Sequence, residues 1–204
     1  MRLPVVMLLA VSATWSRAQG PSVLPARPAS AQTKTTSPAR TTPSASEARS
    51  YSALLLQDAQ TWCAYNSPSD FQSKVATAQP TESARVSFTA NKLTELTYQT
   101  SAESGDWILV DKYTVRGGGV VLRRANLLAQ ENLQVIQESY IREGKVGPFR
   151  LVRVSTLDGR KAELSPEVDL PEVAAQTDLL NSPPVQVAVE LRSTGVKSIC
   201  KKVN

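Results

Sequence analysis

Histidine is absent from this chain of 204 residues, and cysteine occurs only twice. Without histidine the chain cannot form a Ser-His-Asp triad, a Cys-His nucleophile pair or an imidazole metal site. Two cysteines alone cannot build a four-thiolate zinc site or hold an iron–sulfur cluster. We therefore predict that the protein holds no metal and no cofactor, and that catalysis, if there is any, depends chiefly on carboxylates.

Residues 1–18 are predicted to be a secretory signal peptide. Arg2 gives a positive start, an uncharged and mostly apolar run follows, and small residues at the −3 and −1 positions favour cleavage after Ala18. A second small-x-small site leaves cleavage after Ala31 open. The apolar run is about 12 residues long, against the roughly 20 that span a bilayer, and no later segment is longer. We expect a secreted or periplasmic protein, bacterial in origin, without a transmembrane segment once the signal is removed.

Residues 19–50 have the composition of a disordered tether. Proline, serine, threonine and alanine fill 22 of these 32 positions, and no aromatic residue occurs among them. Such a segment cannot bury enough apolar surface to offset the entropy lost on ordering. We therefore predict a tether here and a single folded domain over residues 51–204.

The positive charge of the chain lies outside the predicted domain. The formal charge is +5, from 23 basic and 18 acidic residues. The signal and tether contain six of the basic residues and one of the acidic ones, which leaves 17 of each in residues 51–204. A nucleic-acid-binding domain normally carries a net basic face or stripe. We therefore expect no nucleic-acid partner.

The start of the domain has the spacing of an amphipathic helix. Within residues 51–65, Leu55, Ala59 and Trp62 recur at intervals that place them on one helix face. The sequence Asn-Ser-Pro at 66–68 is interpreted as the end of this helix.

Two further segments are open to a helical interpretation. Residues 171–180 begin with a proline, which suits a first helical turn, and the Asn-Ser-Pro-Pro sequence at 181–184 is interpreted as their end. Residues 127–141 have a helical composition, but the Glu-Gly turn signal that follows favours a strand over 132–141.

Alternating apolar and polar residues predict strands through most of the remaining domain. The triple glycine at 117–119 and the Asp-Gly pair at 158–159 predict tight turns. The predicted fold is α+β and mainly β: an antiparallel meander sheet, free to curl into a half-barrel, with an N-terminal helix packed on it and one short late helix. Besides 132–141, the predicted strands are 85–90, 96–100, 107–115, 120–125, 149–156, 185–191 and 196–203.

The two cysteines, Cys63 and Cys200, lie near the two ends of the predicted domain. In an oxidising compartment an even number of cysteines is expected to pair. We predict an intramolecular disulfide that ties the N-terminal helix to the last strand.

The charged residues of the domain are unevenly distributed along the chain. Residues 116–161 contain nine basic and four acidic residues, whereas residues 162–191 contain six acidic residues and no basic one. This pattern favours a basic and an acidic side of the domain. The arginines expected to bind an anionic partner are Arg123, Arg124, Arg150 and Arg153.

An acid beside an aromatic residue, Asp106-Trp107, is a further candidate binding position, since aromatic rings near acids suit sugars. Asp111 follows, but a five-residue offset puts Asp106 and Asp111 on opposite faces of a strand, about 17 Å apart. We therefore predict an exported, non-enzymatic binding domain whose ligand is a protein, an envelope polymer or an apolar molecule. The alternative prediction is a carboxylate-dependent hydrolase acting on a polysaccharide.

Overall fold

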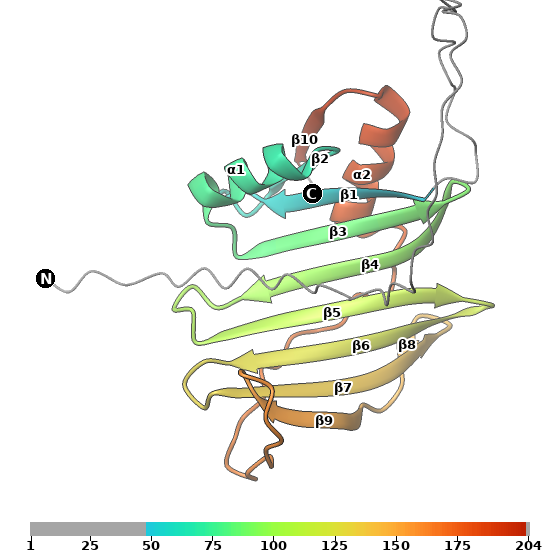
Figure 1. The fold of residues 1–204 in the computed structure, drawn as a ribbon. Helices are drawn as coiled ribbons and strands as arrows, with labels where there is room; N and C mark the ends of the chain where they lie inside the picture. The colour runs from blue at the N-terminus through green and yellow to red at the C-terminus, as the bar shows by residue number, and fades with distance from the viewer. Residues whose placement is uncertain (1–47, 203–204) are drawn as a thin grey trace, which may run out of the picture. The chain divides into compact units, whose positions relative to one another are not determined.

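The described part of the chain folds around one antiparallel sheet, as the alternating pattern of the sequence predicts (Figure 1). The computed structural model describes residues 48–202, so the predicted signal peptide, most of the predicted tether and both candidate cleavage sites lie outside them. The sheet is open, with strand order β10-β2-β1-β3-β4-β5-β6-β7-β8 and with β9 also paired to β7. The strands are β1 (Arg49–Leu55), β2 (Thr61–Tyr65), β3 (Glu82–Thr89), β4 (Lys92–Ser101), β5 (Trp107–Arg116), β6 (Gly119–Leu128), β7 (Leu133–Arg142), β8 (Lys145–Val146), β9 (Arg150–Thr156) and β10 (Ser198–Lys202).

The predicted helix over 51–65 is wrong, because this segment forms the hairpin β1–β2. Asp58 fixes the turn: its Oδ1 atom accepts hydrogen bonds from the backbone N–H groups of Gln60 (3.0 Å) and Thr61 (2.8 Å). Both strands are buried on both faces over much of their length. A strand covered on both sides has apolar residues at nearly every position, and such a run can imitate helical spacing.

The first helix, α1 (Pro68–Ala78), begins where the sequence analysis placed a helix end. Ser67 occupies the N-cap position, and its Oγ atom accepts a hydrogen bond from the backbone N–H of Asp70 at 3.4 Å. Proline is favoured in the first helical turn because its missing N–H has no partner there in any case. The helix packs Phe71 and Val75 against the sheet.

The second helix, α2 (Pro183–Thr194), replaces the strand predicted over 185–191. Its N-cap is Ser182, two prolines fill its first turn, and Gly195 ends it in the left-handed conformation at φ 69°. Of the residues that alternate in the sequence, Val185, Val187 and Leu191 are buried, but Val189 is 40% exposed. The buried set also includes Pro184 and Ala188, and its members Pro184, Val187, Ala188 and Leu191 recur at helical intervals.

The other predicted strands are present. Residues 85–90, 96–100, 107–115, 120–125 and 149–156 correspond to β3, β4, β5, β6 and β9, and residues 196–203 correspond to β10. The ambiguous segment 132–141 is a strand, β7. The glycine turn is confirmed between β5 and β6, where Gly118 has φ 98°.

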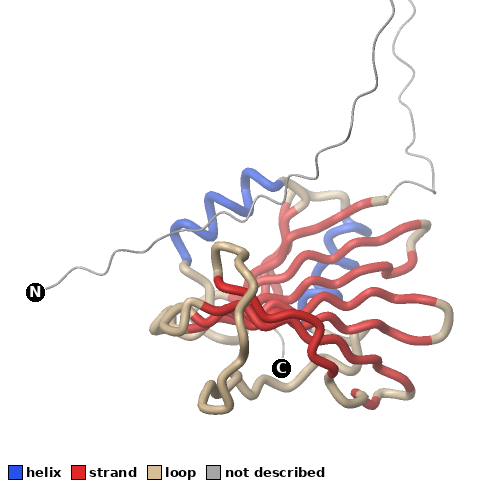
Figure 2. The backbone as a smooth tube through the Cα atoms, turned by 60° about the horizontal axis from the view of Figure 1, so that its bottom comes forward, coloured by secondary structure: helices blue, strands red, loops and turns tan. Residues whose placement is uncertain are grey.

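The two faces of the sheet are covered unequally. On the covered face, α2 packs against β1, β2, β3 and β10, and the main core lies there, with Val86, Tyr113 and Leu122 fully buried. On the opposite, open face, α1 contacts only β1 and β2 (Figures 1 and 2). The remaining strands of the open face carry no covering element among the described residues.

Residues 157–182 cross the covered face without regular secondary structure, so the short helix predicted over 171–180 is wrong. We name this segment the strap. Near its start, the backbone N–H of Ala162 donates a hydrogen bond to Val154 O of β9 (3.3 Å), which holds the strap beside that strand. Farther on, the backbone N–H of Gln176 donates to the Tyr113 hydroxyl at 2.8 Å. The strap therefore runs from β9 to above β5, where neither helix contacts the sheet.

The predicted disulfide between Cys63 and Cys200 is present. It joins β2 to β10, which are directly paired at these two residues, and not a helix to a strand as expected. None of the helices in residues 48–202 is long and apolar enough to cross a membrane.

Candidate binding face

The sheet separates the four predicted binding arginines. Neighbouring residues of a strand point to opposite faces, so Arg123 lies on the open face and Arg124 on the covered face of β6. Arg150 pairs with Glu138, and Arg153 pairs with Ile136, both of which are on the open face of β7. Three of the four arginines therefore share one exposed face.

The register of the sheet aligns further residues with these arginines. Successive Cα partners cross the open face from β1 to β9 in one row, at right angles to the strands: Ser52, Arg85, Thr97, Lys112, Arg123, Glu138 and Arg150. We name its four cations, Arg85, Lys112, Arg123 and Arg150, the basic row. Neighbouring strands lie about 4.8 Å apart, so the basic row spans roughly 24 Å over its five strand steps.

The open face of β3 to β9 has a strong excess of positive charge. Lys112 is paired with Glu95 at 2.7 Å, and Arg150 lies 3.7 Å from Glu138. Arg85 and Arg123 form no salt bridge with any residue in 48–202. On these strands the face carries nine cations, Arg85, Lys92, Lys112, Arg116, Arg123, Arg142, Lys145, Arg150 and Arg153, against two carboxylates, Glu95 and Glu138.

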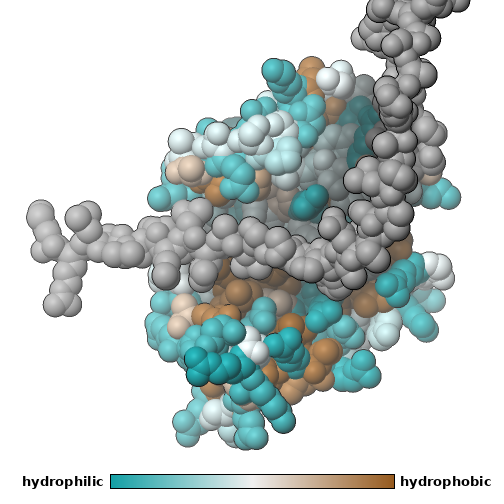
Figure 3. Space-filling view, viewed as in Figure 1, coloured by the Kyte–Doolittle hydropathy of each residue, from teal (hydrophilic) through white to brown (hydrophobic). Residues whose placement is uncertain are grey.

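Apolar side chains flank the basic row on both sides. Val110 and Ile136 lie in the next cross-strand row on one side, and Val121 and Tyr140 lie on the other. Tyr140 is 58% exposed. Figure 3 shows hydrophobic side chains interspersed with hydrophilic ones over this part of the molecule. The face combines positive charge with apolar surface, which suits a large anionic partner better than a single ion.

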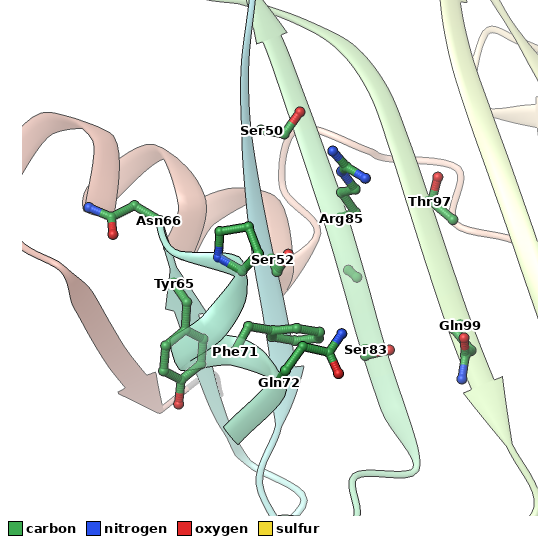
Figure 4. A pocket seen from close by; sticks show the side chains of 12 residues that line it. Ser50, Ser52, Tyr65, Asn66, Phe71, Gln72, Ser83, Arg85, Thr97 and Gln99 are labelled. Carbon is green, nitrogen blue, oxygen red and sulfur yellow. The ribbon is translucent and has the colours of Figure 1, made fainter. Parts of the chain in front are cut away.

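A hollow of about 320 Å³ lies at the β1 end of the row, between α1 and strands β1, β3 and β4 (Figure 4). Arg85 lies within it, beside Ser52 on β1 and Thr97 on β4. Tyr65 and Phe71 form its aromatic wall, with ring centroids 6.2 Å apart in an edge-to-face arrangement. The hollow and the basic row are therefore continuous through Arg85.

The fourth arginine is part of a closed cluster on the covered face. Arg124 donates from Nε to Asp111 Oδ1 (2.8 Å) and from Nη2 to Asp111 Oδ2 (2.7 Å), and the Tyr113 hydroxyl donates to Oδ2 at 3.1 Å. The Phe149 ring lies against the guanidinium at 4.9 Å. Burial alone would lower the pKa of Arg124, but the hydrogen bonds and charge of Asp111 raise it. This arginine is a structural cation and is closed to an external anion.

Alkaline unfolding is expected to report on two tyrosines of the covered face, the half-buried Tyr98 and the buried Tyr113. Burial is the main cause that raises the pKa of Tyr98 and Tyr113 above the ordinary value near 10, and contacts with Glu82 and Asp111 respectively raise it further. The folded state favours the protonated form of both tyrosines, and this preference adds to the free energy of unfolding. The added stability is complete below pH 10 and is lost as the pH rises further. In a titration of tyrosinate absorbance, ionisation of both residues should coincide with loss of the near-ultraviolet circular dichroism. Reversible ionisation in the folded state would contradict this.

Asp106 and Trp107 lie away from the basic row. Asp106 precedes β5, where its Oδ1 atom accepts a hydrogen bond from Gln130 Nε2 at 2.9 Å. Hydrogen bonds from Ser104 and Gln130 lower the pKa of Asp106, which does not suit a general acid near neutral pH. Trp107 is half-buried and pairs with Leu128 on the covered face. Asp111, bound to Arg124, is not free to complete a catalytic carboxylate pair with Asp106.

Arg85 and Lys112 are not among the binding residues that the sequence predicts. Both belong to the polar side of alternating strands, and their alignment with Arg123 depends on pairings between strands that one sequence does not specify. Within residues 48–202 no group of three or more acidic or cysteine side chains could hold a metal ion. Comparison with protein-family models, with curated proteins and with solved structures finds no match to this chain.

Proposed function

We propose that this chain is an exported, non-enzymatic binding domain that holds an anionic polymer along the basic row. The observation that carries the proposal is the charge of the open face, nine cations against two carboxylates, on strands that no described element covers. The Cys63–Cys200 disulfide is compatible with an oxidising compartment.

The shape of the face favours a polymer over a small anion. The basic row is exposed, crosses several strands and spans roughly 24 Å, whereas a small anion would need a concave site with converging donors. Apolar residues such as Val121 and Tyr140 beside the cations offer contact surface for the uncharged parts of a long ligand. An extended acidic chain can contact several of these groups at once.

The carboxylates of the open face support binding more than catalysis. On β3 to β9 they are Glu95 and Glu138, and each lies beside a cation of the row. A glycosidase needs two carboxyl groups facing one another across the substrate, one of them able to donate a proton. Two carboxylates that are already paired with Lys112 and Arg150 do not meet that need.

The test is the double variant Arg123→Gln/Arg150→Gln, measured against an immobilised acidic polysaccharide, polygalacturonate. Each exposed charge contact is worth about 1 kcal/mol at most, so we expect affinity to fall about 5- to 30-fold and its salt dependence to become shallower. The matched control is Lys161→Gln/Lys201→Gln, which removes the same charge from exposed positions outside the basic row and should have little effect.

Three results would contradict the proposal. The first is an equal loss in the control variant, which would mean that only net charge matters. The second is a preference for DNA over the polysaccharide. The third is steady release of reducing ends from the polymer, which would favour the hydrolase.

A further inference from the structure

The hollow beside Arg85 offers hydrogen-bonding groups that the described chain leaves unused. The side chains of Ser52, Ser83, Arg85, Thr97 and Gln99 line it. None of them donates to or accepts from another residue in 48–202 through its side chain, whereas Ser50 at the rim bonds Ser87 and Asn66 bonds Val196 O. The hollow therefore presents a set of hydroxyl, amide and guanidinium groups that face solvent.

These groups come from three neighbouring strands and point to one side. Ser52 pairs with Arg85, Arg85 with Thr97, and Ser83 with Gln99, so the five side chains occupy two adjacent cross-strand rows (Figure 4). Adjacent rows are two residues apart along a strand, about 7 Å, and neighbouring strands are about 4.8 Å apart. This spacing suits the several hydroxyl groups of one or two sugar rings.

The wall of the hollow is aromatic. Tyr65 lies at the end of β2. The backbone next to it is held by a hydrogen bond from the N–H of Asn66 to Lys197 O at 3.1 Å. Phe71 on α1 packs at 6.2 Å from Tyr65. A sugar ring has an apolar C–H face and a hydroxyl edge, and an aromatic wall beside polar groups matches both.

The electrostatics of the hollow add a charge preference. Arg85 is the sole charged residue that lines it, and no carboxylate of the described chain does so. A guanidinium binds a planar carboxylate through two parallel hydrogen bonds. The hollow is thus suited to a sugar with a carboxylate group, and the basic row that continues from Arg85 through Lys112 and Arg123 can hold the units that follow.

We infer that the hollow is a subsite for one uronic-acid unit of an acidic polysaccharide. Arg85 binds the carboxylate, Tyr65 and Phe71 contact the ring, and Thr97, Ser83 and Gln99 bond its hydroxyl groups. This inference rests on the proposed function and specifies its ligand class. The volume of the hollow, about 320 Å³, lies at the small end of the range for ligand pockets, which suits a single unit of a longer chain.

The experiment compares a tetragalacturonate with its methyl ester, which has the same hydroxyl groups and no charge. With the full exported chain in calorimetry, Arg85→Gln should weaken tetragalacturonate binding about 10- to 100-fold, as expected for a lost hydrogen-bonded charge. The same variant should leave the weaker binding of the ester unchanged. The matched control, Arg116→Gln, removes an open-face cation outside both the basic row and the hollow, and should change neither affinity by more than about twofold.

Two further variants test the hydroxyl contacts of the hollow and the basic row separately from the charge of Arg85. Gln99→Ala removes an exposed amide without disturbing the core and should lower the affinity for both tetragalacturonate and its methyl ester about 3- to 10-fold. If Arg123→Gln/Arg150→Gln weakens polymer binding but Arg85→Gln and Gln99→Ala do not, the subsite is wrong while the proposed function stands. Binding of dextran sulfate but not of tetragalacturonate overturns the carboxylate assignment alone. Failure of every polyanion to bind overturns both.

Discussion

The variant Asp111→Ala is expected to lower the free energy of unfolding by about 3–5 kcal/mol. Asp111 is only 3% exposed and Arg124 only 7%, and the two are joined by two hydrogen bonds of 2.8 and 2.7 Å. Removing the carboxylate would leave the guanidinium buried without its partner. It would also remove the acceptor of the hydrogen bond that the Tyr113 hydroxyl donates. That hydroxyl itself accepts a hydrogen bond from the backbone N–H of Gln176 in the strap, so the strap would lose a fixed attachment point.

The measurement is urea denaturation followed by tryptophan fluorescence. The matched control is Glu95→Ala, which breaks the exposed pair with Lys112 and should cost no more than about 1 kcal/mol. The double variant Asp111→Leu/Arg124→Met replaces the pair by apolar side chains of similar size and should recover most of the loss. If Asp111→Ala costs no more than Glu95→Ala, the buried pair is not the stabilising contact described here.

The strands could be predicted from the sequence where only one face of a strand is strongly apolar. In β3, Val86 and Phe88 face the core while Arg85 and Ser87 face outward, and this alternation was visible in the sequence. The prediction failed in β1 and β2, where Leu54 and Cys63 are buried on the α1 side as well. Burial on both faces removes the alternation on which the prediction depends.

Both helices were misplaced for one physical reason. A serine followed by proline predicts the end of a helix at Ser67 and again at Ser182, but in both places it begins one. Serine accepts from free N–H groups at the N-terminus, and proline lacks the N–H that would have no partner there. Serine and proline also occur together in turns after helices, so the pair alone does not show whether a helix begins or ends there. That depends on whether the apolar segment before the pair or the one after it forms the helix.

The candidate site was predictable as a charge cluster but not as a surface. Arg150 and Arg153 are three residues apart, so in a regular strand they would point to opposite faces. A register shift opposite Ile136 and Gln137 brings both to the open face. The addition of Arg85 and Lys112 depends on pairings across β3 to β6, which are set by turns and register and not by local composition.

Reduction of the Cys63–Cys200 disulfide is expected to lower the free energy of unfolding by about 2–5 kcal/mol. The bond closes a separation of 137 residues, and it anchors an edge strand, β10, that is exposed at most positions. In the reduced protein, the amides of Ser198–Lys202 should lose hydrogen-exchange protection first, while those of β3 to β7 keep theirs. An unchanged unfolding midpoint after reduction would contradict this prediction.

The same bond bears on the two proposed sites unequally. The cations of the basic row are on β3, β5, β6 and β9, which the disulfide does not touch. The hollow, however, has Tyr65 in its wall, at the end of the strand to which β10 is tied. Reduction under conditions that keep the protein folded should therefore weaken tetragalacturonate binding, which needs the aromatic wall, more than binding of the long polymer, which the basic row supports. If reduction weakens the binding of both ligands equally, the hollow and the basic row do not bind independently, and the prediction is wrong.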